Sequence, residues 1–116
     1  MLFAGIDAGS RSIKIAIYDA ERKRAVAQAT ADQGVAQDAL VRDLYETLLA
    51  RENLSVSRIT GVVATGYGRN VITFADTTIT EITCHAHGVR HLAPDARTII
   101  EIGRQDSKLI RLGADG

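Results

Sequence analysis

The sequence predicts an α/β domain built on one mixed sheet, and three observations support that prediction. Residues 2–30 contain three β-like segments with connections too short for a crossover, which is typical of an antiparallel meander. Apolar residues recur at helical spacing over residues 35–52. Residues 59–65 form a short apolar run, typical of a strand that is covered on both faces and parallel to its neighbours. Meandering strands followed by helix-linked strands build a mixed sheet covered by helices.

The three N-terminal strands are predicted from their patterns of apolar residues. The apolar run at residues 2–7 indicates a buried strand. Residues 12–18 alternate with period two, so three isoleucines share one face of a second strand. Residues 25–30 alternate more weakly and predict the third strand.

The predicted helix at residues 35–52 is amphipathic and ends near Asn53. Charged side chains occupy one of its faces, which we expect to lie in solvent. Its expected apolar face consists of Ala36, Ala39, Leu40, Leu44, Thr47 and Leu48.

The second half of the chain continues the alternation of strands and helices. After the strand at 59–65, the predicted elements are one or two helical turns at 69–75, a strand at 77–83, a helix at 84–92, and a hairpin of residues 98–102 and 108–112. Pro94 ends the last helix. The hairpin follows a sheet that is already complete, so we expect it to begin a second domain.

Composition excludes several classes of protein. The 14 basic and 14 acidic residues balance, and only 4% of residues are aromatic, unlike a nucleic-acid-binding domain. Cys84 is the only cysteine, so the chain has no disulfide framework and no cysteine set for a zinc or iron–sulfur site. The chain has no signal-peptide pattern and no apolar run near the roughly 18 residues that span a bilayer. We expect a cytoplasmic protein without a membrane or nucleic-acid partner.

The stretch "DAGSRSIK", residues 7–14, predicts a phosphate site. A tight turn with Gly9 lets the backbone amides of residues 9–12 converge on one anion. Ser10 and Ser12 add hydroxyl groups, and Lys14 is placed to neutralise a phosphate oxygen.

Asp7 stands at the end of the strand beside this turn and would repel a phosphate. A magnesium ion, held through water by the carboxylate and by phosphate oxygens, removes the conflict. The alternative is an ordinary hairpin turn, in which Asp7 and Gly9 are present for their turn propensity alone.

A second stretch, "EIGRQDSK" at residues 101–108, repeats this pattern. Glu101 and Gly103 match Asp7 and Gly9 in type and spacing, and Lys108 follows its acid by seven residues, as Lys14 does. Two such loops suit the two walls of one phosphate cleft. Alternatively, the second is a hairpin that reuses the same turn chemistry.

Two further motifs have mainly structural explanations. In "ATGYGR", Gly66 and Gly68 permit close backbone approach, and Arg69 could contact a phosphate or a carboxylate, but a strand-to-helix turn is favoured. In "CHAHGVRH", residues 84–91, His87 and His91 could share a helix face and bind zinc. Packing or a partner-facing surface is favoured, because His85 and His87 point to different sides and Cys84 has no cysteine partner.

The chain has a family resemblance over essentially all of its length. Four stretches carry it, in this order: "GIDAGSRSIK", "ATGYGRN", "EITCHAHG" and "IEIGRQDSKLI". The chain resembles the N-terminal part of the BadF/BadG/BcrA/BcrD-type ATPases, the activators of 2-hydroxyacyl-CoA dehydratases and the ATPase subunits of benzoyl-CoA reductase. The resemblance implies an actin-like fold of two ribonuclease-H-like domains that close on ATP. Residues 1–95 would be the first domain, and residues 96–116 the first hairpin of a second domain that is otherwise missing.

The resemblance also implies roles for individual residues. Asp7 is similar to the magnesium-associated acid, with the ion held through water, and Asp7 and Glu101 would have the catalytic roles. The implied ATP-binding residues are Gly9, Ser10, Arg11, Ser12 and Lys14 in the first loop and Gly103, Arg104, Gln105 and Asp106 in the second. The family's second loop normally reads Asp-Ile-Gly-Gly-Gln-Asp, so Glu101 and Arg104 depart from it.

In such activators, ATP hydrolysis drives an electron from a [4Fe–4S] cluster between two subunits to a dehydratase or reductase partner. This chain ends before the expected cluster cysteines and adenosine pocket, so we predict weak or undetectable ATP binding by the chain alone. The hairpin lacks its native sheet and has open edges, so it should either fold onto the first sheet or pair with a second copy. We therefore expect a homodimer, formed by association or by strand exchange. Two other functions stay open: a fragment of a small-molecule kinase of the same superfamily, and a non-catalytic interaction module that retains the fold.

Overall fold

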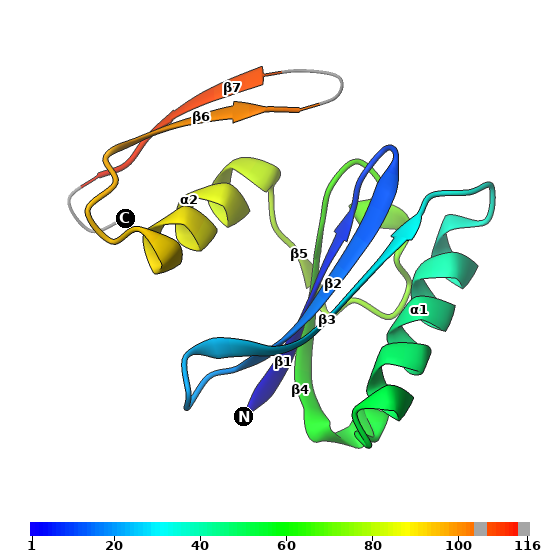
Figure 1. Cartoon of the computed structure of the whole chain (residues 1–116). Coiled ribbons are helices and arrows are strands. Elements are labelled where there is room, and N and C mark those ends of the chain that lie inside the picture. The colour runs from blue at the N-terminus through cyan, green and yellow to red at the C-terminus, as the bar shows by residue number, and fades with distance from the viewer. Residues whose placement is uncertain (104–106, 114–116) are drawn as a thin grey trace. The chain divides into compact units, whose positions relative to one another are not determined.

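The computed structural model describes residues 1–103 and 107–113. The chain forms two compact units, Met1–Ile79 and Thr80–Gly116. Figure 1 shows the elements of each unit.

The first unit is organised around a five-stranded sheet of order β3-β2-β1-β4-β5. Its strands are β1 (Leu2–Ala8), β2 (Ser12–Asp19), β3 (Arg24–Asp32), β4 (Ile59–Thr65) and β5 (Thr77–Thr78). β2 is antiparallel to both β1 and β3, whereas β4 is parallel to β1 and to β5. The predicted meander and the predicted parallel strand are both confirmed.

One face of this sheet packs against helix α1 (Gln37–Arg51) to form the core of the unit (Figure 1). The isoleucines of β2 that the alternation predicted are buried, together with Ile6 of β1. The buried side chains of the helix are Val41, Tyr45, Leu48 and Leu49.

The predicted apolar face of α1 was therefore wrong in part. Leu48 is buried and Leu44 packs against the core, but Ala36, Ala39, Leu40 and Thr47 are exposed. The prediction counted small residues as apolar and omitted Val41 and Tyr45. Positions 41, 45, 48 and 49 follow the i, i+4, i+7, i+8 spacing of one helix face, and the larger side chains decide which face is buried.

A polar and aromatic cluster fixes the first half of α1 to the segment that precedes β5. The carboxylate of Asp38 accepts hydrogen bonds from the amide (2.9 Å) and the hydroxyl of Thr73, and the amide bond is the main cause of its lowered pKa. Arg42 donates to the same hydroxyl at 2.9 Å and lies 4.8 Å from the ring centre of Phe74. Phe74 in turn stacks on Tyr45, with 5.1 Å between ring centres.

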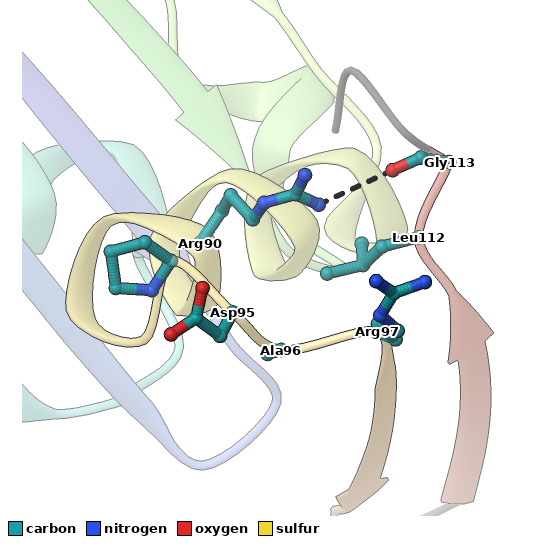
Figure 2. A pocket seen from close by; sticks show the side chains of 7 residues that line it. Arg90, Asp95, Ala96, Arg97, Leu112 and Gly113 are labelled. Atoms are coloured by element: carbon teal, nitrogen blue, oxygen red, sulfur yellow. Dashed lines mark hydrogen bonds between the residues drawn. The ribbon is translucent and has the colours of Figure 1, made fainter.

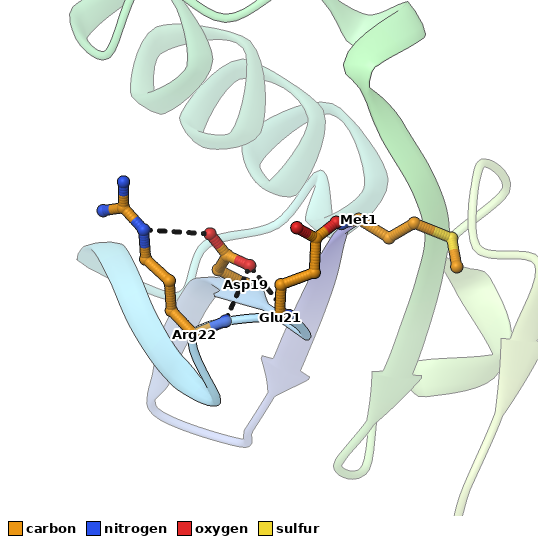
Figure 3. Close-up of polar contacts among 4 residues, drawn as sticks. All are labelled: Met1, Asp19, Glu21 and Arg22. Carbon is orange, nitrogen blue, oxygen red and sulfur yellow. Dashed lines mark hydrogen bonds and ion pairs between the residues drawn. The ribbon is translucent and has the colours of Figure 1, made fainter.

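The turn between β2 and β3 is held by its own side chains, as Figure 3 shows. One carboxylate oxygen of Asp19 accepts bonds from the amides of Glu21 (2.9 Å) and Arg22 (3.1 Å). The bond from Arg22 is the main cause of the lowered pKa of Asp19. The α-amino group of Met1 contacts the carboxylate of Glu21 at 2.8 Å, so the start of the chain is tied to this turn. Lys23 completes the turn with a positive φ of 57°.

The second unit consists of helix α2 (Glu81–Leu92) and a hairpin of β6 (Thr98–Ile102) and β7 (Ser107–Arg111). The predicted hairpin is confirmed, and α2 ends two residues before Pro94. The predicted strand at 77–83 was too long, because β5 contains two residues and α2 begins three residues earlier than expected. Glu81 in the first turn favours this start through the helix dipole.

Two short 3₁₀ helices complete the fold: η1 (Val56–Arg58) and η2 (Arg69–Val71). The second confirms the helical turn that was predicted within residues 69–75. None of the helices in the described part of the chain is long and apolar enough to cross a membrane.

Candidate functional site

The turn between β1 and β2 is narrow and braced by the residue that follows β3. The amide of Gly9 donates to the carbonyl of Ser12 at 3.0 Å, which closes the turn. The side-chain amide of Gln33 donates to the carbonyl of Gly9 at 2.7 Å, and its backbone amide donates to the carbonyl of Arg11 at 2.9 Å. The backbone amides of Ser10 and Arg11 take no part in these three bonds. Of the amides expected to converge on an anion, that of Gly9 is committed to the turn itself.

Asp7 and Lys14 face each other across the antiparallel ladder of β1 and β2. Ile6 and Ala8 are buried against the core, so Asp7, which lies between them, is on the opposite face of the sheet. Side chains directly opposite each other in such a ladder have Cβ atoms about 4.5–5.5 Å apart. The acid and the lysine predicted for the phosphate site are thus neighbours; Asp7 is half-buried and Lys14 is exposed.

The turn after β4 packs directly on the end of β1. Thr65 is the parallel ladder partner of Asp7. The amide of Gly68 donates to the carbonyl of Ala8 at 2.9 Å. Gly66 has a φ of +92°, and a Cβ atom there would lie 2.6 Å from the oxygen of Ala8 and 2.7 Å from Oδ1 of Asp7. No residue with a side chain fits this position without displacing its neighbours.

Arg69 stabilises this turn from within. Its guanidinium donates to the carbonyl of Gly66 at 2.9 Å, as expected for the structural interpretation of "ATGYGR". The hydroxyl oxygen of Thr65 is buried and has no hydrogen-bond partner among the described residues. Sequence reasoning missed both Thr65 and Gln33, because neither lies in a motif that resembles a phosphate loop.

The second loop reproduces the acid–lysine pair of the first. Glu101 and Lys108 are ladder partners in the hairpin of β6 and β7. The ammonium of Lys108 lies 3.7 Å from Glu101 and 3.6 Å from Glu81, the first residue of α2. Gly103 follows β6 and is exposed. The other predicted residues of this loop lie outside the described residues: Arg104, Gln105 and Asp106.

The cysteine and histidines of α2 do not form a recognisable metal site. The described residues contain no group of three or more His, Cys, Asp or Glu side chains that could hold an ion. Cys84 is a free, half-buried cysteine.

The second unit also contains an open pocket of about 540 Å³ that the sequence did not predict. Figure 2 shows it between the end of α2 and the ends of the hairpin, where Arg90 donates to the carbonyl of Gly113 at 3.3 Å. Its lining residues are Arg90, Pro94, Asp95, Ala96, Arg97, Leu112 and Gly113. We assign it no function, because its arginines, its acid and its backbone groups favour no single ligand.

Comparison with known proteins identifies the family. The profile of the BadF/BadG/BcrA/BcrD ATPase family matches residues 4–116. The activator of lactoyl-CoA dehydratase from Anaerotignum propionicum is 42% identical over 120 residues, which cover 100% of this chain and 44% of the relative. The 2-hydroxyisocaproyl-CoA dehydratase activator from Clostridioides difficile is 39% identical over 116 residues, which cover 100% of this chain and 43% of the relative. The chain thus spans less than half the length of these relatives.

Solved structures agree with the sequence comparison. The activator of the 2-hydroxyisocaproyl-CoA dehydratase from Clostridium difficile with bound ADPNP superposes with a TM-score of 0.87 at 37% identity, over 99% of this chain and 42% of that one. Component A of the (R)-2-hydroxyglutaryl-CoA dehydratase from Acidaminococcus fermentans superposes with a TM-score of 0.88 at 30% identity. The match covers 98% of this chain and 44% of that one. A hexokinase from Thermus thermophilus shares the fold alone, with a TM-score of 0.61 at 15% identity. The chain has a mixed α/β actin-like ATPase fold, and it belongs to the BadF/BadG/BcrA/BcrD ATPase family, matching the N-terminal part of the dehydratase activators.

Proposed function

We propose that this chain is the N-terminal phosphate-binding part of an ATP-hydrolysing activator that drives electron transfer to a CoA-ester dehydratase or reductase. The observation that carries the proposal is the braced turn at Gly9–Ser12 with Asp7 and Lys14 opposed beside it. This arrangement occurs in a chain that is 39–42% identical to two dehydratase activators.

The residues of the first turn fit a magnesium–phosphate group chemically. The amides of Ser10 and Arg11 and the hydroxyls of Ser10 and Ser12 would donate to phosphate oxygens, and Lys14 would neutralise charge. The Asp7 carboxylate is an oxygen ligand that suits hydrated Mg²⁺. When bound, the ion supplies charge neutralisation at the phosphates. Asp7 orients the ion's water or the attacking water.

The second loop is proposed as the other wall of the cleft, with Glu101 as its acid and residues 103–106 as its backbone donors. Its support is the repeated acid–lysine pair, in which Glu101 and Lys108 are cross-strand partners as Asp7 and Lys14 are. In this proposal residues 1–95 are the first ATPase domain, and residues 96–116 are the first hairpin of the second.

In this proposal the [4Fe–4S] cluster belongs to the whole activator, and the dehydratase or reductase component is the partner of that whole activator. Cys84 is the only cysteine here, and a cluster of this type takes four thiolates. The residues of this chain therefore do not fit the cluster, and we assign them no step of the electron transfer.

ATP binding by this chain is expected to be weak, because one phosphate loop provides no wall for the adenine. We expect a Kd of about 1–10 mM, which corresponds to about −4.1 to −2.7 kcal/mol. Calorimetry that showed a Kd of about 1 μM, or about −8.2 kcal/mol, would contradict this expectation.

A homodimer is also proposed, with the outer face of the hairpin as its contact. Ile100, Ile102 and Leu109 share this face, and their side chains are 72%, 80% and 73% exposed. The hairpin has only two strands, so both of its edges are open to a second copy.

Amide hydrogen exchange tests the phosphate site directly. ATP should protect the amides of Ser10 and Arg11 when magnesium is present and should protect them much less when it is absent. The matched control is Asp43→Asn on the exposed side of α1, which should leave the protection unchanged. Equal exchange with and without magnesium–ATP at these residues would refute the proposed site.

A further inference from the structure

We propose that the turn Thr65–Arg69 is a third wall of the phosphate site, which fixes the position of the Asp7 carboxylate and presents the Thr65 hydroxyl to the hydrated magnesium ion or to a phosphate oxygen. This inference rests on the proposed function. It assigns a positioning role to Gly66 and a ligand-contacting role to Thr65.

The sheet topology brings this turn to the site. β1 and β4 are adjacent and parallel, so their carboxyl ends lie at the same edge of the sheet. Asp7 and Thr65 are ladder partners, and directly paired residues present their side chains on the same face. Thr65 is therefore the β4 residue that lies beside Asp7, on the face opposite to α1.

Gly66 controls the space around the carboxylate. A Cβ atom at this position would lie 2.7 Å from Oδ1 of Asp7, closer than carbon and oxygen can approach. The φ of +92° also requires a conformation that residues with side chains rarely adopt. Any larger residue would have to change the turn or displace Asp7, so Gly66 is a positioning residue for the acid.

Two hydrogen bonds hold the turn in place. Its carbonyl at Gly66 is held by Arg69 at 2.9 Å, and the amide of Gly68 is held by the carbonyl of Ala8 at 2.9 Å. Gly68 also lies against the side chain of Gln37, where an added Cβ would come within 2.8 Å. The turn is thus fixed to β1 and packs against the start of α1.

Thr65 contributes a buried side-chain hydroxyl to this turn that lacks a hydrogen-bond partner among the described residues. By contrast, the hydroxyl of Thr73 is engaged by both Asp38 and Arg42. Buried hydroxyls are normally satisfied, and a valine would fill the same volume at no polar cost. A water of the ion or a phosphate oxygen beside Asp7 would supply the missing partner.

The test measures magnesium–ATP binding to the 116-residue chain by ¹H–¹⁵N NMR, which detects millimolar affinities. Thr65→Val replaces the hydroxyl with a methyl group of similar size and should weaken binding about three- to tenfold, as expected for one lost hydrogen bond to a charged group. Thr65→Ser should restore affinity to within about twofold. Thr60→Val, at an exposed position of the same strand, is the matched control and should bind as the parent does.

A second measurement isolates the positioning role of Gly66. Mn²⁺ in place of Mg²⁺ should broaden the amide signals of residues 7–12 in the parent chain with ATP. Gly66→Ala should reduce this broadening at least about tenfold at equal metal concentration, because the carboxylate is displaced. The amide signals of β2 and β3 show whether the Gly66→Ala variant remains folded. If it unfolds, the third wall is tested by the Thr65 variants alone.

The outcomes separate the two levels of the proposal. If the parent chain binds magnesium–ATP at residues 9–12 and Thr65→Val binds equally well, the third wall is refuted while the phosphate site stands. If the parent shows no magnesium-dependent change at residues 7–14 at about 10 mM ATP, the proposed function fails and this inference with it.

Discussion

The two hairpins of the molecule carry the same local chemistry but have different surroundings. In each, an acid near the end of the first strand faces a lysine seven residues later across the ladder, Asp7 with Lys14 and Glu101 with Lys108. The first hairpin is part of a five-stranded sheet, whereas the second is a sheet of two strands.

The neighbours of the two acids differ accordingly. Asp7 lies against the backbone of Gly66, the first residue after the parallel strand β4, and Gln33 braces the adjacent turn. In the second hairpin, Glu101 shares its lysine with Glu81 of α2. A hairpin motif therefore sets the acid–lysine pair, and the rest of the fold decides how firmly the acid is held.

The largest difference is expected in what each hairpin contributes to stability. Leu48→Ala removes a buried side chain of α1 that packs on the first hairpin and should lower the free energy of unfolding by about 2–5 kcal/mol. Leu109→Ala, on the exposed face of the second hairpin, should change it by less than about 0.5 kcal/mol at concentrations where the chain is monomeric. Urea denaturation followed by circular dichroism measures both, and equal losses would show that the two hairpins are supported alike.

Removing the charge of each acid compares the two loops in function. In a full-length relative, the change that corresponds to Asp7→Asn should lower ATP hydrolysis about 100-fold, because it removes the carboxylate that orients the ion or the attacking water. The melting temperature should change little, since Asp7 lies outside the buried core. Undiminished turnover would exclude the assigned role. The change that corresponds to Glu101→Gln should have a smaller effect than that at Asp7 if the first loop holds the ion.

Self-association should depend on the second hairpin and not on the first. Leu109→Lys places a charge on the exposed apolar face and should weaken dimerisation about tenfold or more, or about 1.4 kcal/mol. Light scattering over a range of concentrations measures the effect. Val56→Lys is the control, because it adds the same charge at an exposed apolar position of the first unit. A parent chain that stays monomeric at high concentration contradicts the dimer.

The smallest expected effect is on the stability of the first unit at low pH. The pKa of Asp38 is lowered, first by the amide of Thr73 and then by its hydroxyl, so the folded state favours the carboxylate. Its contribution to stability is present above about pH 4 and is lost as the pH falls through the lowered pKa. Asp38→Asn should therefore flatten the fall in melting temperature between about pH 4 and pH 2, whereas Asp43→Asn on the same helix should not. Parallel curves for the parent and Asp38→Asn would contradict this account.

The sequence predicted those parts of the fold that depend on local patterns. The alternating isoleucines of β2 and the short connections predicted the meander, and the apolar run of β4 predicted a parallel strand. The start of α2 was predicted too late because residues 77–83 are rich in β-branched threonine and isoleucine, a composition typical of a strand. The acidic charge of Glu81 in the first turn favours the helix despite that propensity.

Only those residues of the candidate site that lie within one local motif could be predicted from the sequence. Asp7 and Lys14 were identified from a spacing that also sets their pairing in the ladder. The contact of Gly66 with Asp7 joins residues 59 positions apart and depends on the register of two parallel strands, which no local pattern specifies. Gln33 was missed for a similar reason, because its role depends on where β3 ends relative to the turn.

The bonds from Gln33 make the turn sensitive to the alignment of an outer strand. β3 is at the edge of the sheet, and its last residue, Asp32, is opposite Ser12. If the register of β3 shifted by one position, Asp32 or Gly34 would take the place of Gln33 beside the carbonyl of Gly9. The ionised carboxylate of Asp32 has no hydrogen-bond donor, and Gly34 has no side chain, so the bond from the side chain of Gln33 would be lost. A shift in the register of β3 would therefore disturb the turn at Gly9–Ser12 of the first hairpin, and a changed signal of the Gly9 carbonyl would report it.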